Sequence, residues 1–436
     1  MNHSLNKINL SRLKSTFEVS SNIGKTKGGG LTRLPLSKED KEMRDVFISW
    51  LKDAGLHVRI DDMGNIYGRR DGTNKNAGAV MIGSHLDTQP KGGRFDGILG
   101  VLSALEVIRT LNDNNIETER PIEIVNFTAE EGGRFGVPMV GSGVITDNLT
   151  KEFVFSLRDK NGITFGESLE EIGYIGEAKN RFINFNVDYY VEAHIEQSTV
   201  LEKNQNSIGI VKGIAGETRF EACVKGQSTH AAHSPSERRD ALVAASEMVL
   251  AVDSLKEQFE GLSPAIGTFE VYPSLQTITA SEVKFVYIIR HFNDDISNKA
   301  IELVKKQFRE IAGRRNVEVN IEQYWKAEST EFVDEVTTLI EEGAKVHGYS
   351  YQNILSTAGH DATYVNGIVK SGMIFAPSVG GLSHCEEEFT SYEEIEKTAN
   401  VLLYVVESLA KKEPGNTVLA APDGSEVEFK PEEERN

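Results

Sequence analysis

The sequence predicts an α/β protein in which a larger domain, with a mixed sheet flanked by helices, carries a smaller inserted α+β domain. Through the first two hundred residues, short apolar runs typical of buried strands alternate with amphipathic helical patterns, as in α/β folds. The predicted pattern of strands and helices changes after about Gly209, where a few strands are separated by two long helices. The 436-residue chain also exceeds the size of one hydrophobic core, so more than one domain is expected.

The first element with a clear start and stop is a helix within residues 36–55. Ser37 suits the N-cap position, apolar residues recur at helical spacing, and Gly55 suits the C-terminal stop. The elements that follow in the larger domain are a buried strand in 78–87, a helix over 98–111, and strands in 121–132 and 184–198. Each of these strands runs into polar residues.

The insert is predicted as strand, helix, strand, helix, strand. The five elements lie in 207–226, 236–255, 280–292, 294–313 and 316–325, and helix 330–348, strand 371–378 and helix 392–412 then resume the first pattern. We therefore expect the larger domain at 1–208 and 327–412, the insert at 209–326, and a flexible, polar tail at 413–436.

Composition excludes several classes of function. The formal net charge of −19 argues against a nucleic-acid-binding protein, which needs a basic face. The apolar runs are shorter than the roughly 20 residues of a membrane span, and the N-terminus lacks the apolar segment of a secretory signal. Two cysteines, Cys223 and Cys385, form no disulfide framework and fit a reducing compartment. We expect a cytoplasmic protein that has neither a nucleic-acid nor a membrane partner.

Polar side chains gather where the predicted strands end. They are His85, Asp87, Asp96, Glu130, Glu131, His194 and His384. In α/β sheets, ligands bind at the carboxyl ends of the strands. Histidine and carboxylate together form the nitrogen and oxygen donor set of many metal sites, and catalytic zinc sites use this set while leaving a position for water. The pattern therefore predicts a metal-dependent active site.

The spacing assigns different tasks to neighbouring residues. His85 and Asp87 are two positions apart, so they face the same way in an extended segment, and Asp87 could fix the tautomer of His85. Asp96 follows a Gly-Gly turn and could bridge two metals. The neighbours Glu130 and Glu131 point apart, so one could bind metal while the other acts as a general base. Two metals together would hold a water and polarise a carbonyl group.

Several motifs in order resemble a known superfamily. The motifs are GSHLDTQPKGGRFDG (83–97), FTAEEGGRFG (127–136), EAHIEQS (192–198), STAGHDA (356–362) and GLSH (381–384), with TRLPLSKED (32–40) and DDMGNIYGRRDG (61–72) in support. Together they resemble the dinuclear-metal aminoacylase and carboxypeptidase superfamily. The closer similarity is to its hydantoinase/carbamoylase branch, which contains N-carbamoyl-L-amino acid hydrolases, β-ureidopropionases and allantoate amidohydrolases. The resemblance covers about residues 20–410.

This resemblance implies a role for each metal-site position. One divalent metal would be held by His85, Asp96 and His194, and a second by Asp96, Glu131 and His384. Zinc is the first expectation, with manganese, cobalt or nickel as alternatives. Glu130 would take a proton from the bridging water and pass it to the leaving nitrogen. The peptidase branch usually has an acid at the position of His194, so this histidine favours the amidase branch.

The resemblance also implies residues that bind a small-molecule substrate. Gln197 would bind its ureido or amide end, Arg290 its carboxylate, and His360, beside Asp361, would line the pocket. His230 would stabilise the oxyanion, within one subunit or across a dimer interface. The insert would be a lid and dimerisation domain, which implies a homodimer.

One segment departs from the family pattern. The family has N-x-I-P-G before the strand that carries the arginine, whereas this chain has TITAS at 277–281. Thr277 stands where an asparagine that touches substrate is expected. Ile289 replaces the aspartate before the arginine, and Ala232 replaces a glycine after His230. The metal motifs are intact, so the resemblance implies the reaction class but leaves the substrate open.

The resemblance thus implies a metal-dependent amidohydrolase that cleaves a linear carbon–nitrogen bond of an N-carbamoyl amino acid or a related ureido acid. An aminoacylase or dipeptidase of the same superfamily is the enzymatic alternative. A non-catalytic binding protein on this scaffold is the second, and the retention of Glu130 and all five predicted ligands argues against it. The segment GKTKGGG (24–30) lacks the residue order of a phosphate-binding loop and is expected to be an ordinary loop.

Overall fold

The computed structural model describes residues 5–411, and beyond them only the backbone of the short strands β14 (Leu419–Ala420) and β15 (Glu426–Val427), which pair with each other. The rest of the predicted tail at 413–436 lies outside the described residues. The chain divides into two compact units. The first contains the chain up to Lys212, Phe332–Ile354 and the chain from His360 onward, and the second contains Gly213–Glu331 with Leu355–Gly359. The sequence placed these boundaries after residues 208 and 326.

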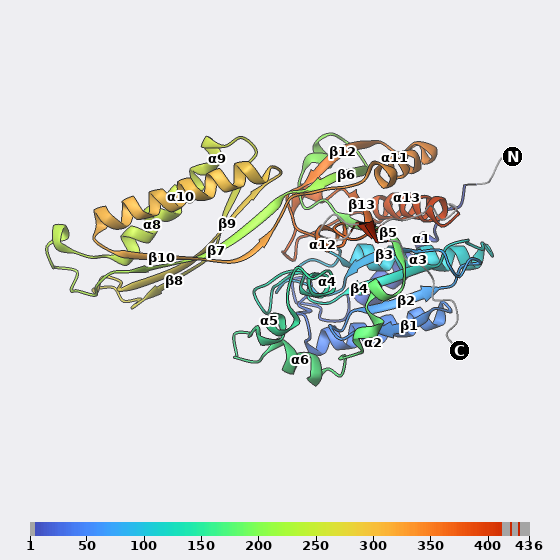
Figure 1. Ribbon diagram of the computed structural model, residues 1–436, viewed down its shortest axis with the longest axis horizontal. Coiled ribbons are helices and arrows are strands. Elements are labelled where there is room, and N and C mark those ends of the chain that lie inside the picture. The colour runs from blue at the N-terminus through green and yellow to red at the C-terminus, as the bar shows by residue number, and fades with distance from the viewer. Residues whose placement is uncertain (1–4, 412–418, 421–425, 428–436) are drawn as a thin grey trace. The chain divides into compact units, whose positions relative to one another are not determined.

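Most of a nine-stranded mixed sheet lies in the first unit (Figure 1). The strands of this sheet are β1 (His57–Ile60), β2 (Ile66–Arg70), β3 (Ala79–His85), β4 (Ile122–Phe127), β5 (Val187–Ile195), β6 (Ile208–Ile214), β11 (Thr330–Glu331), β12 (Tyr351–Ser356) and β13 (Lys370–Ala376). Strand β11 and the last residues of β6 and β12 belong to the second unit. The order across the sheet is β1-β2-β4-β3-β5-β13-β6-β11, and β12 also pairs with β6.

The four central strands, β4, β3, β5 and β13, run parallel. Every residue of β3 and β4 is buried, which explains their continuous apolar runs. The register places His85 opposite Phe127 and His194 opposite Phe375, so both histidines lie at the carboxyl ends of their strands. This edge is where a doubly covered parallel sheet presents its ligand-binding loops.

Helices cover the sheet of the first unit. They are α1 (Leu10–Ser20), α2 (Lys38–Asp53), α3 (Ile98–Asp113), α4 (Val140–Ile145), α5 (Lys151–Ser156), α6 (Phe165–Glu171), α7 (Val200–Lys203), α11 (Asp334–His347), α12 (Ala362–Val365) and α13 (Tyr392–Ala410), with the 3₁₀ turns η1 (Ala178–Asn180), η2 (Phe182–Asn184) and η4 (Val379–Gly381). α3 and α13 pack against each other and against β3 and β5 (Figure 1).

The predicted helix after Ser37 is confirmed, because the Ser37 side chain accepts a hydrogen bond from the backbone N–H of Asp40 at the start of α2. Helix α1, by contrast, has no counterpart in the predicted elements. Its sequence is polar on average, and Leu13 and Phe17 are among the few apolar side chains that it buries.

The second unit is a four-stranded antiparallel sheet with two packed helices. Its elements are β7 (Gly216–Lys225), η3 (Pro235–Glu237), α8 (Ala241–Asp253), α9 (Leu255–Gln258), β8 (Ser263–Tyr272), β9 (Glu282–His291), α10 (Asp294–Arg315) and β10 (Glu318–Ala327), in the sheet order β10-β7-β9-β8. Alternate residues of β7 and β9 are buried with α8 and α10, among them Phe220, Phe285 and Tyr287. Strand β8 was not predicted from the sequence, and the first predicted strand is split at Ala215 into β6 and β7.

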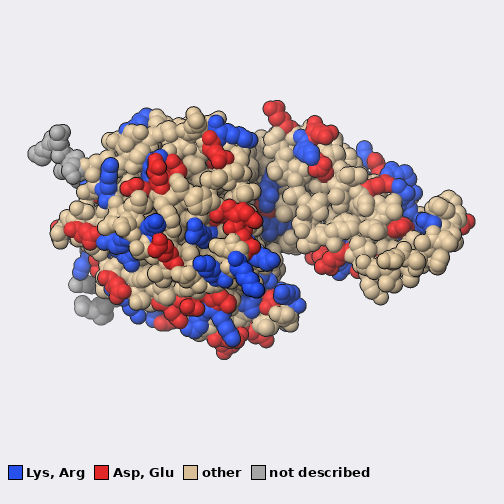
Figure 2. Space-filling view, turned by 180° about the vertical axis from the view of Figure 1, so that it is seen from behind, with Lys and Arg blue, Asp and Glu red and all other residues tan. Residues whose placement is uncertain are grey.

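The predicted fold class, a mixed sheet flanked by helices plus a smaller α+β part, is confirmed by this architecture. On the face seen in Figure 2, basic and acidic side chains are interspersed and form no single field of one sign. Within the described part of the chain, no helix combines the length and the apolar composition that crossing a membrane requires.

Candidate metal centre and active site

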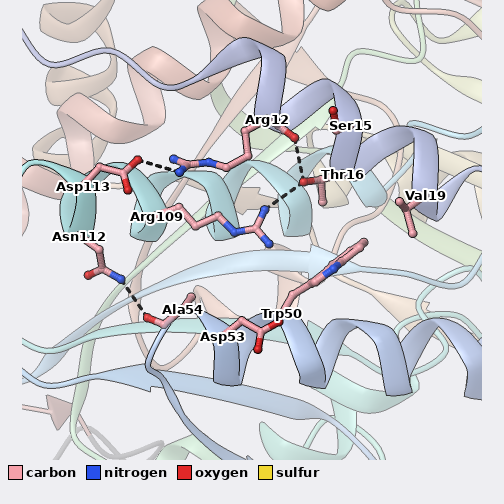
Figure 3. A pocket seen from close by; sticks show the side chains of 10 residues that line it. All are labelled: Arg12, Ser15, Thr16, Val19, Trp50, Asp53, Ala54, Arg109, Asn112 and Asp113. Atoms are coloured by element: carbon pink, nitrogen blue, oxygen red, sulfur yellow. Dashed lines mark hydrogen bonds and ion pairs between the residues drawn. The ribbon is translucent and has the colours of Figure 1, made fainter.

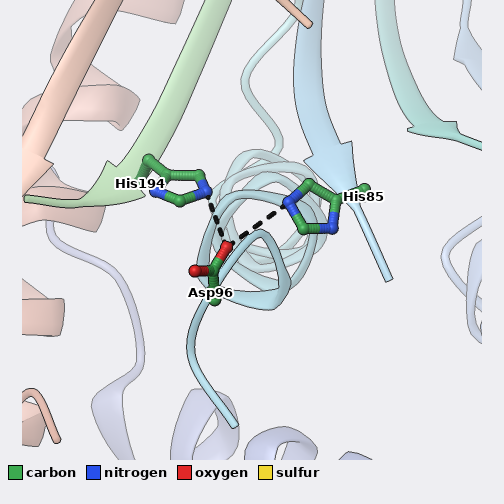
Figure 4. A group of neighbouring side chains, drawn as sticks. All are labelled: His85, Asp96 and His194. Atoms are coloured by element: carbon green, nitrogen blue, oxygen red, sulfur yellow. Dashed lines mark ion pairs between the residues drawn. The ribbon is translucent and has the colours of Figure 1, made fainter. Parts of the chain in front are cut away.

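Three buried side chains meet at the carboxyl edge of the sheet of the first unit. His85 ends β3, His194 lies near the end of β5, and Asp96 stands in the loop that leads into α3 (Figure 4). The same Asp96 oxygen, Oδ1, lies 3.5 Å from Nε2 of His85 and 3.2 Å from Nε2 of His194. The ligand atoms of the three residues lie within 4.8 Å of one another, so they could hold one cation.

The backbone fixes how the two imidazole rings face this point. Nδ1 of His85 lies 3.0 Å from the carbonyl oxygen of Asp87, and Nδ1 of His194 lies 2.9 Å from the carbonyl oxygen of Ile195. A carbonyl can only accept, so each Nδ1 carries a proton and each Nε2 of a neutral ring presents a lone pair on the side of Asp96. Nε2 of His194 also accepts the backbone N–H of Gly97 at 3.1 Å. Nε2 of His85 is buried and has no hydrogen-bond partner among the described residues. Lone pairs that converge on a carboxylate fit a divalent cation.

A second group uses the other oxygen of Asp96. Nε2 of His384 lies 3.4 Å from Asp96 Oδ2 and 3.2 Å from Glu131 Oε2. The ligand atoms of these three residues also lie within 4.8 Å of one another. Each oxygen of Asp96 therefore faces a different group of ligand atoms, which is the arrangement that a bridging carboxylate needs.

The carboxylates of the two groups favour positive charge on their neighbours. Burial lowers the pKa of His384, but hydrogen bonds and charges of Asp96 and Glu131 raise it to about 11. Burial likewise lowers the pKa of His85, yet Glu130, Asp96 and Asp87 raise it well above its usual value. The neighbouring carboxylates thus favour positive charge at both groups, which a bound divalent cation would supply.

Glu130 lies beside the first group and belongs to neither. It is buried, and its Oε2 lies 3.6 Å from Nε2 of His85. Burial, followed by the charges of Asp361 and Glu131, raises its pKa well above the usual value, although His85 lowers it. The preceding residue, Ala129, has a left-handed backbone with φ of 58°, so the chain bends sharply just before the Glu130–Glu131 pair.

Asp87 acts differently from the expectation that its carboxylate orients His85. The carboxylate is 3.8 Å from Nδ1 of His85, and the closer acceptor is the backbone carbonyl of the same residue. The two carboxylate oxygens instead accept the backbone N–H groups of Glu130 and Glu131, each at 3.3 Å. Asp87 therefore holds the loop of both glutamates, and burial raises its pKa to about 6.

Gln197 and His360 also belong to this cluster. Nε2 of Gln197 donates to Oδ2 of Asp96 at 2.6 Å, while its Oε1 is buried and lacks a hydrogen-bond partner among the described residues. His360 is buried with its ring edge-on to His194, at 4.4 Å between ring centroids. Next to it, burial and the charge of Glu192 raise the pKa of Asp361 to about 8.

The other predicted substrate residues lie in the second unit. His230 and Thr277 are neighbours there, because Ala231 N donates to the Thr277 carbonyl at 2.8 Å and His230 bridges to Ile278. Arg290 stands on β9, where its Nε donates to Glu217, its register partner on β7. The structure thus brings His230 and Thr277 together, whereas the side chain of Arg290 is held by β7.

Two residues that the sequence analysis did not select contact the cluster. Ser383 donates from its hydroxyl to Asp96 Oδ2 at 2.8 Å, and Glu388 accepts the backbone N–H of Asp96 at 3.1 Å. The available signal was their position, because they flank His384 in the sequence on both sides.

A surface cavity of about 490 Å³ lies elsewhere in the first unit, among α1, α2 and α3 (Figure 3). Its polar groups pair with one another: Arg12 with Asp113, Arg109 with Thr16, and the Asn112 amide with the carbonyl of Ala54. None of the predicted site residues lines it.

Comparisons with known proteins decide the family. Residues 81–408 match peptidase family M20/M25/M40. The chain belongs to this family. An N-carbamoyl-L-amino-acid amidohydrolase of Rhizobium meliloti is 34% identical to this M20 chain over 402 residues, which cover 92% of this chain and 96% of that protein. A probable allantoate deiminase of Oryza sativa subsp. japonica is 33% identical, with 86% and 83% covered.

Solved structures of the family agree with the sequence relatives. The crystal structure of an amidase of the hydantoinase/carbamoylase family from Burkholderia vietnamiensis superposes on this M20 chain with a TM-score of 0.89. The two chains are 37% identical in sequence, and the superposition covers 94% of this chain and 100% of the Burkholderia vietnamiensis chain. The resemblance to the hydantoinase/carbamoylase branch of the superfamily is thereby confirmed.

Proposed function

We propose that this M20 family chain is a metal-dependent amidohydrolase that cleaves the linear carbon–nitrogen bond of an N-carbamoyl amino acid or a related ureido acid. The observation that carries the proposal is the place of Asp96, whose two oxygens face two groups of ligand atoms, with Glu130 beside the first. Relatives named N-carbamoyl-L-amino-acid amidohydrolase and allantoate deiminase support the substrate class.

Two sets of side chains would hold the metals. His85, Asp96 and His194 would hold one divalent ion, and Asp96, Glu131 and His384 the other. Nitrogen and carboxylate donors of this kind suit zinc, with manganese, cobalt or nickel as alternatives. When bound, such a pair of ions polarises a carbonyl group and lowers the pKa of a water.

Proton transfer from the water to the leaving nitrogen is assigned to a side chain of the protein. Glu130 accepts a proton from the attacking water and delivers it to the leaving nitrogen, so one carboxylate serves as general base and then as general acid. The bond between the carbamoyl carbon and the substrate nitrogen breaks as the water oxygen bonds to that carbon. The amino acid leaves with its amine restored, and the carbamic acid left behind decomposes to carbon dioxide and ammonia.

We assign substrate recognition to side chains that can hydrogen-bond or ion-pair with the ureido and carboxylate groups of the substrate. The unpaired Oε1 of Gln197 accepts from the ureido N–H groups, and the planar guanidinium of Arg290, held at Nε by Glu217, pairs with the substrate carboxylate. His230 stabilises the oxyanion, His360 lines the pocket, and Thr277 occupies the place of a substrate-contacting asparagine. We further propose a homodimer formed through the second unit, which would act as a lid, and a cytoplasmic setting, which the two free cysteines support.

A substrate panel tests the function. Metal-loaded protein is offered N-carbamoyl-α-amino acids, N-carbamoyl-β-alanine, allantoate, N-acetyl amino acids and dipeptides, and release of free amine is measured. The proposal expects hydrolysis of the carbamoyl or ureido compounds. Hydrolysis of N-acetyl amino acids or dipeptides alone would identify an aminoacylase or dipeptidase instead. Binding without any turnover would identify a binding protein.

Removing the metals should abolish turnover. Because the carboxylate and imidazole lone pairs of the two groups converge, chelation leaves them without their shared cations, and activity is expected to return when zinc, manganese or cobalt is added. Rates and metal content are measured on the same samples. A fully active preparation that contains no metal would contradict the proposed metal centre.

Replacing Arg290 with alanine should raise KM for a carboxylate substrate by about 10- to 100-fold, because a charge-assisted hydrogen-bonded pair contributes about 1.5–3 kcal/mol. The kcat should change less. Arg219, which also pairs with Glu217, provides the matched control, and Arg219→Ala is expected to leave KM within about threefold. An unchanged KM in Arg290→Ala would reject the anchoring role.

A further inference from the structure

A buried carboxylate, that of Glu388, connects the two loops that deliver Asp96 and His384. Its Oε1 accepts the backbone N–H groups of Phe95 at 3.0 Å and of Asp96 at 3.1 Å. Its Oε2 lies 3.0 Å from the hydroxyl oxygen of Ser383, whose single proton is shared between Glu388 and Asp96 Oδ2. One side chain therefore fixes the backbone of one ligand residue and the immediate neighbour of the other.

The loop before Asp96 is shaped to receive this carboxylate. A Cβ built on Gly93 would lie 1.9 Å from Oε1 of Glu388, a distance at which no side chain fits unless the glutamate moves. Gly93 does not have a left-handed backbone, so the need for glycine here comes from the close approach of Glu388. The close approach to Gly93 and the hydrogen bonds to Phe95 and Asp96 thus hold the Glu388 carboxylate in one position.

His384 depends on such support more than the other two histidines do. The rings of His85 and His194 are each held at Nδ1 by a backbone carbonyl. The His384 side chain is 49% exposed, and the ion pairs recorded for it among the described residues are those with Asp96 and Glu131. Its backbone is left-handed, with φ of 57°, a conformation that the surrounding chain must impose.

We propose that Glu388 is a positioning residue for the second metal group: by tying Phe95–Asp96 to Ser383, it sets the distance between Asp96 and His384 and so supports the affinity of that group more than the affinity of the first. This inference rests on the proposed metal centre. The first group shares Asp96 but depends less on Glu388, because its two histidines, His85 and His194, stand on β3 and β5 and are oriented by their own backbone.

The test measures zinc affinity site by site. Apoprotein of the full chain is titrated with zinc against a chromogenic chelator, and His384→Ala identifies which of the two binding steps belongs to the second group. In Glu388→Ala that step is expected to weaken about 10- to 100-fold, as is typical when a supporting partner of a ligand is removed. The other step should stay within about threefold. Glu388→Gln retains an acceptor for the two N–H groups and should restore the second step to within about threefold of the unsubstituted protein.

Gly93→Ala supplies an independent variant and a double-mutant cycle. Its added methyl group should displace Glu388 and weaken the same binding step, whereas adding Gly93→Ala to Glu388→Ala should cost little more, because both act through one contact. Asp61→Ala is the matched control for losing a buried loop carboxylate. Asp61 accepts the backbone N–H groups of Met63 and Asn65 and the hydroxyl of Tyr67, but contacts no predicted ligand. It should lower the melting temperature of the apoprotein and leave both zinc affinities within threefold.

The outcomes separate this inference from the proposed function. Fewer than two zinc ions bound by the unsubstituted protein would overturn the metal centre and this inference with it. Two zinc ions bound equally well by Glu388→Ala, or an equal weakening of both steps, would overturn only the role of Glu388. So would a glutamine variant as impaired as the alanine variant. A protein that binds two zinc ions but hydrolyses no ureido compound would overturn the substrate assignment and leave the role of Glu388 intact.

Discussion

Glu130→Gln should lower kcat by about 10²- to 10⁴-fold while both metals remain bound. Glutamine has the size and shape of glutamate but cannot accept and return a proton. The buried carboxylate lies 3.6 Å from Nε2 of His85 and belongs to neither group of three ligand atoms, so its loss should leave metal binding intact. The kcat is obtained from initial rates of amine release, and metal content from elemental analysis of the same samples.

The neighbouring residue provides the matched control. Glu131 faces His384 at 3.2 Å, so Glu131→Gln is expected to lower the metal content of the second group, which Glu130→Gln should not do. If Glu130→Gln keeps turnover within tenfold of the unsubstituted enzyme, another residue is the general base.

Gly97→Ala should eliminate the first metal group and with it the activity. Gly97 has a φ of 65°, and a Cβ at this position would lie 2.2 Å from Nε2 of His85, the atom that faces Asp96. The loop cannot simply move away, because Asp96 precedes this residue and α3 begins directly after it. Metal content, activity and thermal unfolding are measured together, with an expected loss of metal and about 1–3 kcal/mol of stability.

Gly162→Ala separates the steric effect of a methyl group from the backbone effect. Gly162 also has a positive φ, of 82°, but a Cβ there meets no atom within 4 Å. This variant should cost only the backbone penalty of about 1–2 kcal/mol and retain both metals and full activity. A Gly97→Ala protein that retains both metals would show that His85 is not confined by this contact.

Much of the fold was predictable because its central elements carry strong local signals. The continuous apolar run of β3 and the capped, periodic sequence of α2 are typical of their structures. Strand β8 was missed because its side chains are mostly half-buried or exposed, which leaves no alternation to detect. Helix α1 was missed because a helix with few buried residues at a polar N-terminus has a weak amphipathic pattern.

The residues of the candidate site that follow the ends of strands could be predicted from the sequence. Contacts made by backbone atoms or between distant segments could not. His85, Asp96 and His194 were selected from their position after apolar runs, and the structure brings them together. That the carbonyl of Asp87, and not its carboxylate, meets the His85 ring depends on backbone dihedral angles that no residue pattern encodes. The link from Glu388 to the loop of Asp96 joins positions 292 residues apart, so only the folded chain reveals it.

The chain enters and leaves the second unit on paired strands. In the antiparallel pair β6 and β11, Gly213 lies opposite Glu331 and Ile214 opposite Thr330. Residues paired in this way have Cα atoms about 5 Å apart, a gap that a short turn can close. The segment between the paired residues, 215–329, therefore begins and ends at neighbouring points of the sheet. Apart from residues 355–359, the second unit is one continuous stretch of sequence, so it could be replaced without altering the strands that carry His85 and His194.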